Sequence, residues 1–251
     1  MRAVEAPEDA ARDPLLLTGE RTLPGIPEEN YWFQRHVVAY QMAAAMVAGR
    51  EVLDAGVGEG YGAAMLASTA ASVVGVDIEA DVIDHAATAY PSVRFQTADL
   101  VSLPFPDGSF DAVVSFQVIE HLQRPREFVS ECARVLRPGG RLILSTPNRL
   151  TFSPTGVRNP FHTVEFAAAE LRAVLTASFV VERMAGTFHG RKIRLLEGVL
   201  RGSVPERLIR QPVPEWPAWL RRFVAAVRPS DFRIADRQVD RSLDLIAIAR
   251  R

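Results

Sequence analysis

The sequence has little of several features that would point to a particular class of protein. Its single cysteine, Cys132, cannot form a disulfide within the chain, so a reducing compartment is expected. The formal net charge of −1 provides no general attraction to nucleic acid or to an anionic membrane. No apolar run is long enough to span a bilayer, and residues 1–14 lack the apolar core of a signal peptide. These absences predict a cytoplasmic protein without nucleic-acid or membrane partners.

The chain does contain enough apolar material for one α/β domain. Of its 251 residues, 48% are hydrophobic, which suits a single sizeable core. Residues 1–30 hold several prolines and charges, and we interpret them as a mobile N-terminal arm ahead of one domain over 31–251. Within that domain, residues 188–240 are rich in Arg, Pro and Trp without a clean strand pattern. We interpret them as an inserted helical cap or as an interface, for which a homodimer is one possibility.

The most informative stretch runs from Glu51 to Gly62 and reads EVLDAGVGEGYG. A short apolar run ends at Asp54, glycines follow at alternate positions, and a helical pattern begins at Ala63. This pattern is typical of a first parallel strand, a tight turn and a helix N-terminus. Glycine is needed where the backbone takes positive φ, or where a ligand must approach closer than a Cβ allows. The glycines expected to contact a ligand are Gly56, Gly58 and Gly60.

Asp54 helps to decide between two kinds of nucleotide ligand. A carboxylate at the carboxyl end of this strand would repel the pyrophosphate of a dinucleotide, but it would attract an ammonium or a sulfonium. It therefore favours S-adenosylmethionine as the cofactor. The glycine turn alone is weak support, because residues 58–63 also satisfy a loose dinucleotide pattern and a tight turn needs no ligand. A nicotinamide-dependent oxidoreductase is therefore kept as an alternative class of enzyme.

Two further acidic residues follow buried strands. Asp77 ends an apolar run, where an acid can accept hydrogen bonds from a ribose diol, although it could instead cap the helix that begins near Ile78. Asp99 follows a third strand and could accept a hydrogen bond from an adenine amino group, with Leu100 against the ring. With Ile78, and with Phe116 at the end of a fourth strand, these residues complete the predicted cofactor site.

The carboxyl ends of the later strands supply the candidate catalytic groups. The predicted strand 110–116 leads directly to Glu120 and His121, and the loop 150–165 carries His162. Ligands bind at this edge of an open parallel sheet. His121 is the first candidate for a general base because imidazole can be neutral near pH 7, and Glu120 and His162 are the additional catalytic candidates. The bland alternatives are a structural pair at a helix start for Glu120-His121 and a loop-ordering contact for His162.

Four residues are candidates for binding the acceptor substrate. Asn30 can cap a helix running from about Tyr31 to Ala48, and Tyr31, Trp32 and the Arg35-His36 pair could close over the site. Alternatively, that helix simply docks on the sheet. Asn148 and Arg149 directly follow the fifth strand and could either hydrogen-bond a sugar hydroxyl or brace the loop. The substrate-binding candidates are therefore Tyr31, Trp32, Asn148 and Arg149.

A succession of motifs between residues 45 and 150 resembles the class I S-adenosylmethionine-dependent methyltransferases. The motifs are Asp54 with its glycines, Asp77, Asp99, residues 111–121 and Pro138-Gly139-Gly140. The resemblance implies a Rossmann-like α/β fold with helices on both faces of a seven-stranded, mostly parallel sheet. The implied strand order is 3-2-1-4-5-7-6 with strand 7 antiparallel, and the apolar segment 242–249 suits that strand.

Six short segments carry a narrower resemblance over almost the whole chain. They are TGERT at 18–22, ENYWF at 29–33, FQVIEH at 116–121, STPNR at 145–149, NPFHT at 159–163 and SLDLIA at 242–247. They resemble a group of actinobacterial sugar O-methyltransferases that includes the methylmannose polysaccharide 1-O-methyltransferase. The resemblance implies methyl transfer to a short oligosaccharide, with the 1-OH of a 3-O-methylated mannoside as the acceptor hydroxyl. Polymethylated polysaccharides of this kind are made inside the cell, which agrees with the predicted compartment.

Glu120-His121 also resembles the acid–histidine pair with which certain quinone-pathway O-methyltransferases of this fold hold Mg²⁺. Those enzymes have a further carboxylate three residues before the glutamate, where this chain has Gln117, a weaker ligand for a hard cation. Two mechanisms therefore stay open. Either His121 is the base, or Mg²⁺ is held by Glu120, His121 and Gln117 while His162 serves as the base. A Mg²⁺-dependent O-methyltransferase of another glycan or small molecule and a catalytically silent binding module are the remaining alternatives.

Overall fold

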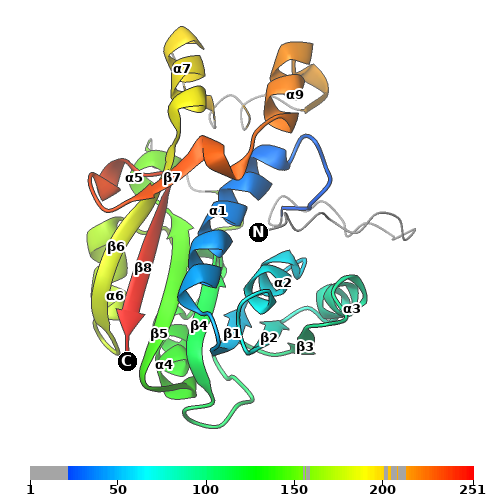
Figure 1. The fold of residues 1–251 in the computed structure, drawn as a ribbon. Helices are drawn as coiled ribbons and strands as arrows, with labels where there is room; N and C mark the ends of the chain where they lie inside the picture. Colours follow the sequence, from blue (N-terminus) through cyan, green and yellow to red (C-terminus); the bar gives the residue numbers. More distant parts are fainter. Residues whose placement is uncertain (1–21, 155, 157–158, 201–202, 205–207, 209–212) are drawn as a thin grey trace.

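The structure is a computed structural model, and it describes residues 22–154, 156, 159–200, 203–204, 208 and 213–251. Most of the arm predicted over 1–30, including nearly all of the segment 18–22, lies outside the described residues. Figure 1 shows a twisted sheet with helices on both of its faces and two further helices, α7 and α9, projecting beyond one end. Among the described residues, no helix is long and apolar enough to cross a membrane.

The described strands form one sheet in the order β3-β2-β1-β4-β5-β8-β6-β7. Their bounds are β1 Glu51–Ala55, β2 Ser72–Asp77, β3 Arg94–Thr97, β4 Phe110–Phe116, β5 Leu136–Pro147, β6 Val180–His189, β7 Phe232–Ala235 and β8 Asp244–Arg250. The neighbouring strands are parallel in the part of the sheet that runs β3-β2-β1-β4-β5. By contrast, β8 runs antiparallel to both β5 and β6. The predicted Rossmann-like sheet is confirmed, with β8 as the antiparallel strand inserted between the fifth and sixth.

The structure adds an eighth strand to the seven that were expected. β7 pairs antiparallel with β6 at the edge of the sheet, from Gly186↔Ala235 to His189↔Phe232. It comes from the segment 188–240, for which the sequence predicts an inserted helical cap or an interface. A strand of four residues with only Phe232 buried has no apolar run to reveal it. The same segment also forms α7 and α9, which project beyond the sheet as a cap would.

Two apolar clusters cover opposite faces of the sheet. The helices are α1 Asn30–Met46, α2 Tyr61–Ala67, α3 Ala80–Ala89, α4 Pro125–Val135, α5 Arg149–Phe152, α6 Ala168–Leu175, α7 Arg191–Leu200 and α9 Ala218–Ala225. Residues from α1, α2 and α3 share one cluster with Val52 and Val114, while residues from α4 and α6 share the other with Leu53 and Val113. Adjacent strand residues face opposite ways because side chains alternate along a strand. Cys132 is fully buried in the second cluster, as small core residues are.

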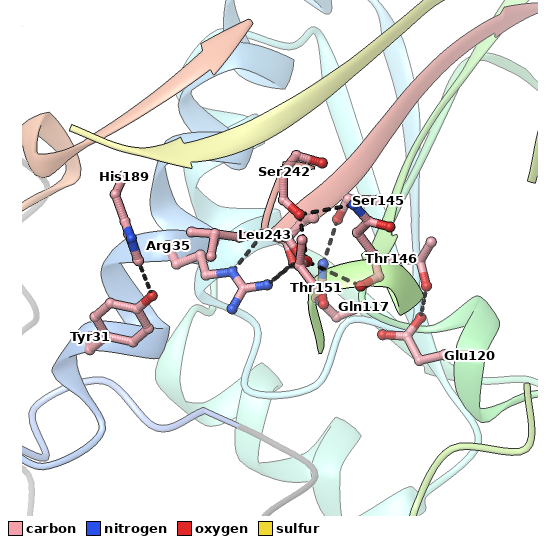
Figure 2. Close-up of polar contacts among 12 residues, drawn as sticks. Tyr31, Arg35, Gln117, Glu120, Ser145, Thr146, Thr151, His189, Ser242 and Leu243 are labelled. Atoms are coloured by element: carbon pink, nitrogen blue, oxygen red, sulfur yellow. Dashed lines mark hydrogen bonds and ion pairs between the residues drawn. The ribbon is translucent and has the colours of Figure 1, made fainter. Parts of the chain in front are cut away.

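A buried ion pair holds α1 against the C-terminal strand. The Arg35 Nε donates to Asp244 Oδ2 at 2.6 Å, and its Nη2 donates to Asp244 Oδ1 and, at 3.0 Å, to the carbonyl of Leu243. Arg35 is 4% exposed and Asp244 3% exposed. Figure 2 shows Arg35 reaching from α1 toward Leu243. Since both charges are almost completely buried, each depends on the other for compensation.

The expectation that Asn30 caps α1 is wrong. The N-cap residue is Glu29, which makes no side-chain capping bond, and Asn30 is already helical. The Asn30 amide instead donates to the carbonyls of Val224, Ala225 and Val227 at 2.9, 3.2 and 2.9 Å. The last carbonyls of a helix have no partner within it. Asn30 therefore satisfies the end of α9 and fastens α1 to the cap.

We predict that Arg35→Ala lowers the free energy of unfolding by about 3–5 kcal/mol, because Asp244 would stay buried without its counter-charge. Urea denaturation would measure the loss. Arg149→Ala is a matched control, since it removes the exposed pair with Glu170 and should cost only about 0–1 kcal/mol. Equal losses in the two variants would contradict the role assigned to the buried pair.

Candidate functional site

A pocket of about 360 Å³ lies at the carboxyl ends of the central parallel strands. Its walls come from the segments that follow β1, β2, β3 and β4, and from the faces of α1 and α2 that overhang them. This is the edge at which an open parallel sheet binds its ligands, because the loops diverge there. The pocket therefore occupies the position that the strand-end acids predicted.

Most of the predicted cofactor residues line this pocket. Those in its wall are Gly56, Gly58, Asp77, Ile78, Asp99, Leu100 and Phe116. Asp54 and Gly60 are buried and are not part of the lining. Asp77 also ties the glycine turn to the next loop, since it accepts hydrogen bonds from the amides of Gly58 at 3.0 Å and Glu79 at 3.3 Å.

The glycine turn has a backbone that other residues would not adopt easily. Gly56, Gly58 and Gly60 have φ values of 84°, 50° and 87°, in the left-handed region that favours glycine. Space is also short at Gly56, where a Cβ would lie 2.3 Å from Cγ2 of Val118. Val118 comes from the segment that carries the catalytic candidates. The turn can therefore approach that segment closely only because position 56 has no side chain.

Asp54 is a buried carboxyl group with one neutral donor. Among the described residues, its side-chain partner is the Tyr40 hydroxyl, 3.4 Å from each of its two oxygens. Burial raises the Asp54 pKa to about 8, the Tyr40 hydrogen bond lowers it, and the charge of Asp77 raises it. A ligand cation would stabilise the ionised form and lower this pKa, whereas a ligand phosphate would raise it further. The site is therefore electrostatically suited to a positively charged ligand.

Sequence reasoning missed Tyr40 and Tyr61 and mentioned His36 only as a possible lid. All three line the pocket. The His36 Nδ1 lies 3.1 Å from the Tyr61 hydroxyl, and burial lowers the His36 pKa to about 4, so this imidazole is neutral at pH 7. His36 and Tyr40 are four residues apart on α1 and share one face of it. That spacing, together with the aromatic residue in the glycine turn, was the available signal.

The structure places Tyr31 and Trp32 outside the pocket lining. Tyr31 is fully buried, and its hydroxyl lies 2.6 Å from Nε2 of His189 (Figure 2). Its ring contacts that of Trp32 edge-on at 4.9 Å, and both pack in the cluster formed by α7, α9 and β7. Their position fits the alternative in which this end of the helix docks against its neighbours, and it does not support direct contact with an acceptor.

Asn148 and Arg149 also lie outside the pocket lining. Asn148 is fully buried, donates to the carbonyls of Ser242 at 3.0 Å and Val239 at 3.2 Å, and accepts from the amide of Leu150 at 3.1 Å. Arg149 pairs with Glu170 at 2.9 Å on the surface. These contacts fit the alternative in which the two residues brace the loop.

The three catalytic candidates come together at one edge of the pocket. Glu120, His121 and His162 each offer one ligand atom, and these atoms all lie within 4.8 Å of one another. We call these three side chains the Glu-His-His cluster. Only His121 belongs to the pocket lining; Glu120 is 1% and His162 9% exposed. The amide of Thr163 donates to the Glu120 carbonyl at 2.8 Å, which fastens the His162 loop to this strand end.

Hydrogen bonds at the Nδ1 atoms orient both imidazoles of the cluster. The His121 Nδ1 lies 3.0 Å from the carbonyl oxygen of Phe161, and the His162 Nδ1 lies 2.9 Å from Oε1 of Glu165. A carbonyl and a carboxylate can only accept, so each Nδ1 carries the hydrogen. In the neutral imidazoles the lone pair is then on Nε2. His121 can therefore accept a proton or bind a cation through that atom.

Hydrogen bonds to neighbouring side chains also hold Glu120 and Gln117. Glu120 accepts a hydrogen bond of 2.9 Å from the Thr146 hydroxyl, and burial raises its pKa to about 8 (Figure 2). Gln117 lines the pocket in an uncommon left-handed conformation, φ 57°. Its amide nitrogen donates to the Ser145 hydroxyl at 3.0 Å. The amide nitrogen of the side chain expected as the third metal ligand is thus bound to β5, and His162 is the further side chain that lies with Glu120 and His121.

Comparison with known proteins gives consistent results. A family model described as a methyltransferase domain matches residues 53–144. Two mycobacterial proteins, each named a probable S-adenosylmethionine-dependent methyltransferase, are similar over nearly their whole lengths. The protein from Mycolicibacterium smegmatis is 50% identical over 97% of this chain and 98% of its own. The protein from Mycobacterium tuberculosis strain H37Rv is 49% identical over 94% of this chain and 89% of its own.

Solved structures support the fold at lower sequence similarity. A crystal structure from Thermotoga maritima, described as an S-adenosylmethionine-dependent methyltransferase and possible histamine N-methyltransferase, matches with a TM-score of 0.63. The match covers 88% of this chain and 93% of that one at 15% identity. At this identity the likeness concerns the arrangement of strands and helices only.

We predict that Asp54→Asn flattens the pH dependence of stability in the ligand-free protein. The folded state holds the Asp54 pKa at about 8, above the ordinary value of 3.8, so between these values the folded state binds more protons than the unfolded state. The free energy of unfolding should therefore fall as the pH rises from about 4 to about 8. Asn does not titrate, and its introduction should remove up to about 1.4 kcal/mol of that fall per pH unit.

Urea denaturation at several pH values would measure this effect, and Asp111→Asn is a control of opposite sign. The Asp111 pKa is held below its ordinary value by the amide of Glu51 and by Arg137. Its stabilising contribution is therefore lost as the pH falls, not as it rises. If Asp54→Asn and the unmodified protein showed the same pH dependence, the buried carboxyl would not have the assigned role.

Proposed function

Because this chain belongs to the S-adenosylmethionine-dependent methyltransferases, we propose that it transfers a methyl group to a hydroxyl of a short sugar acceptor. The nicotinamide-dependent oxidoreductase is set aside, since the full-length relative at 50% identity is named a methyltransferase. The observation that carries the proposal is the Glu-His-His cluster at the edge of the pocket, with the lone pair of His121 on Nε2. A hydroxyl needs such a group in order to react, whereas an amine or a thiolate can react without one.

In this proposal the cofactor lies along the strand ends. The ribose diol would donate hydrogen bonds to Asp77, and the adenine amino group would donate to Asp99. Ile78 and Leu100 would lie against the adenine ring. The cationic sulfur would lie near the aromatic rings of Tyr40 and Phe116, whose faces attract cations. Asp54, buried behind that wall, would be ionised in the presence of this cation and would add negative charge.

The reaction is an in-line displacement at the methyl carbon. The acceptor oxygen forms a bond to the methyl carbon while the carbon–sulfur bond breaks. The electron pair of the broken bond stays on sulfur, which becomes a neutral thioether. The acceptor hydroxyl must lose its proton as this happens. The Glu-His-His cluster can help in either of two ways. His121 Nε2 can take the proton, or a cation such as Mg²⁺ bound there can stabilise the forming alkoxide.

A sugar acceptor suits the surroundings of His121. Gln117 and Gln123 line this part of the pocket and offer amide groups that match hydroxyls. Phe161, whose carbonyl accepts from His121, is 40% exposed and offers an apolar surface to the C–H face of a sugar or to its O-methyl groups. These features and the sequence resemblance favour the 1-OH of a 3-O-methylated mannoside, an acceptor used in polymethylated polysaccharide biosynthesis.

A labelled-methyl assay with a panel of mannosides would test the acceptor. Methyl incorporation should require a free 1-OH and should rise when the 3-OH carries a methyl group. Product mass spectrometry would locate the new methyl. Incorporation into a non-sugar hydroxyl alone would overturn the sugar proposal while leaving O-methylation intact.

We predict that His121→Ala lowers turnover by about 10²–10⁴-fold, because the acceptor oxygen would lose its activating group. The affinity for S-adenosylhomocysteine, measured by calorimetry, should change little. His85→Ala is a matched control, since it removes an imidazole that contacts Glu59 at 3.0 Å and lies outside the cluster. Full activity of His121→Ala would show that this imidazole has no part in the reaction.

A further inference from the structure

We propose that Glu120, His121 and His162 form a binding site for a divalent transition-metal ion of the Zn²⁺, Mn²⁺ or Co²⁺ class, rather than for Mg²⁺. The site would place a Lewis acid beside the acceptor oxygen, and in this respect the inference rests on the proposed function. It chooses between the two ways in which the cluster could activate a hydroxyl.

The spacing of the three donor groups suits one small ion. Their ligand atoms lie within 4.8 Å of one another. Ligands about 2.0–2.2 Å from a zinc-like ion lie up to about 4 Å apart, so adjustments of roughly 1 Å would close the site. Three protein ligands also leave a coordination position open, as catalytic metal sites do. Since His121 lines the pocket, that position would be available to a ligand in the pocket.

The outer contacts of the cluster are those that metal-binding imidazoles usually have. A metal-ligating histidine donates its other N–H to a carbonyl or a carboxylate, which fixes the tautomer and the ring direction. His121 donates to the carbonyl of Phe161, and His162 to the carboxylate of Glu165, which is 7% exposed. Thr146 holds Glu120 by a hydrogen bond to one carboxylate oxygen. All three proposed ligands are thus oriented by a second set of residues.

The burial of Glu120 gives a second reason to expect a cation. Its carboxylate is 1% exposed, and it accepts a hydrogen bond from the neutral hydroxyl of Thr146. Arg35, the buried arginine whose charge acts on it, is bound to Asp244. Buried carboxylates are normally paired with a charge or coordinate a metal. A divalent ion between Glu120 and the two imidazoles would provide that compensation.

The donor set decides the class of ion. Two imidazole nitrogens and one carboxylate favour Zn²⁺, Mn²⁺, Co²⁺ or a related ion, whereas Mg²⁺ prefers six oxygen ligands. A magnesium site would need further oxygen donors, whereas this cluster supplies one carboxylate and two imidazoles. The nitrogen donor from His162 is the structural difference from the oxygen-rich set that the sequence suggested.

Cobalt titration of the full-length, chelator-treated protein would test the site. Co²⁺ should bind with a stoichiometry of one and produce visible absorption bands, and Zn²⁺ should displace it. His162→Ala and Glu120→Gln should weaken Co²⁺ binding at least 10-fold. His85→Ala should bind Co²⁺ like the unmodified protein, because it removes an imidazole outside the cluster.

Glu165→Gln provides a test that does not remove a ligand. It should weaken Co²⁺ binding by about 10–100-fold, since loss of an outer carboxylate typically costs that much. Circular dichroism would confirm that each variant is folded. Unchanged Co²⁺ affinity in folded Glu165→Gln and His162→Ala, or no Co²⁺ binding by the unmodified protein, would overturn the proposal.

Activity and cofactor binding separate this proposal from the broader one. Protein shown to be metal-free by elemental analysis should bind S-adenosylhomocysteine normally but transfer methyl groups slowly, and Zn²⁺, Mn²⁺ or Co²⁺ should restore the rate. Full activity without metal would overturn the metal site and leave the proposed methyl transfer to a sugar standing. Metal binding without methylation of any sugar would overturn the sugar proposal and leave the metal site standing.

Discussion

The buried ion pair between Arg35 and Asp244 sets the geometry on which the pocket depends. It fastens α1 to β8, the strand that joins the two halves of the sheet. With the helix fixed in rotation at Arg35, the next residue, His36, and Tyr40 one turn later face the pocket, while Tyr31 faces the cap. The shape of the pocket depends on this orientation, because α1 covers the glycine turn and contributes His36 and Tyr40 to the pocket wall.

The ionisable side chains lie at two different edges of this pocket. Asp54 is buried behind the wall with the Tyr40 hydroxyl as its donor, and Tyr40 can approach only because position 62 is glycine, where a Cβ would lie 2.0 Å from Cζ of Tyr40. At the other edge the Glu-His-His cluster combines one buried carboxylate with two oriented imidazoles. In the proposed reaction, the cationic methyl donor would therefore lie at one place and the acceptor hydroxyl beside it, with His121 at the boundary.

Some parts of this arrangement could be predicted from local sequence. Asp54, Asp77 and Asp99 each follow an apolar strand, and parallel strands bring their carboxyl ends to one edge regardless of the details of packing. The aromatic residues at the start of α1 could not be assigned in this way. Three adjacent aromatics point in three directions around a helix, and the sequence does not state which direction faces the sheet. β7 was missed because a short, half-exposed edge strand has no periodic apolar pattern.

By itself, the sequence determined the first parallel strands, the glycine turn and the acids that follow those strands, because short-range periodicity and strand-end chemistry are local properties. Only the tertiary structure decided which side chains of α1 reach that pocket, and that His162 lies with Glu120 and His121. Those outcomes depend on how a helix is rotated and how a loop is fastened. Contacts far apart in the chain, such as Arg35 with Asp244 and Thr163 with Glu120, settle both.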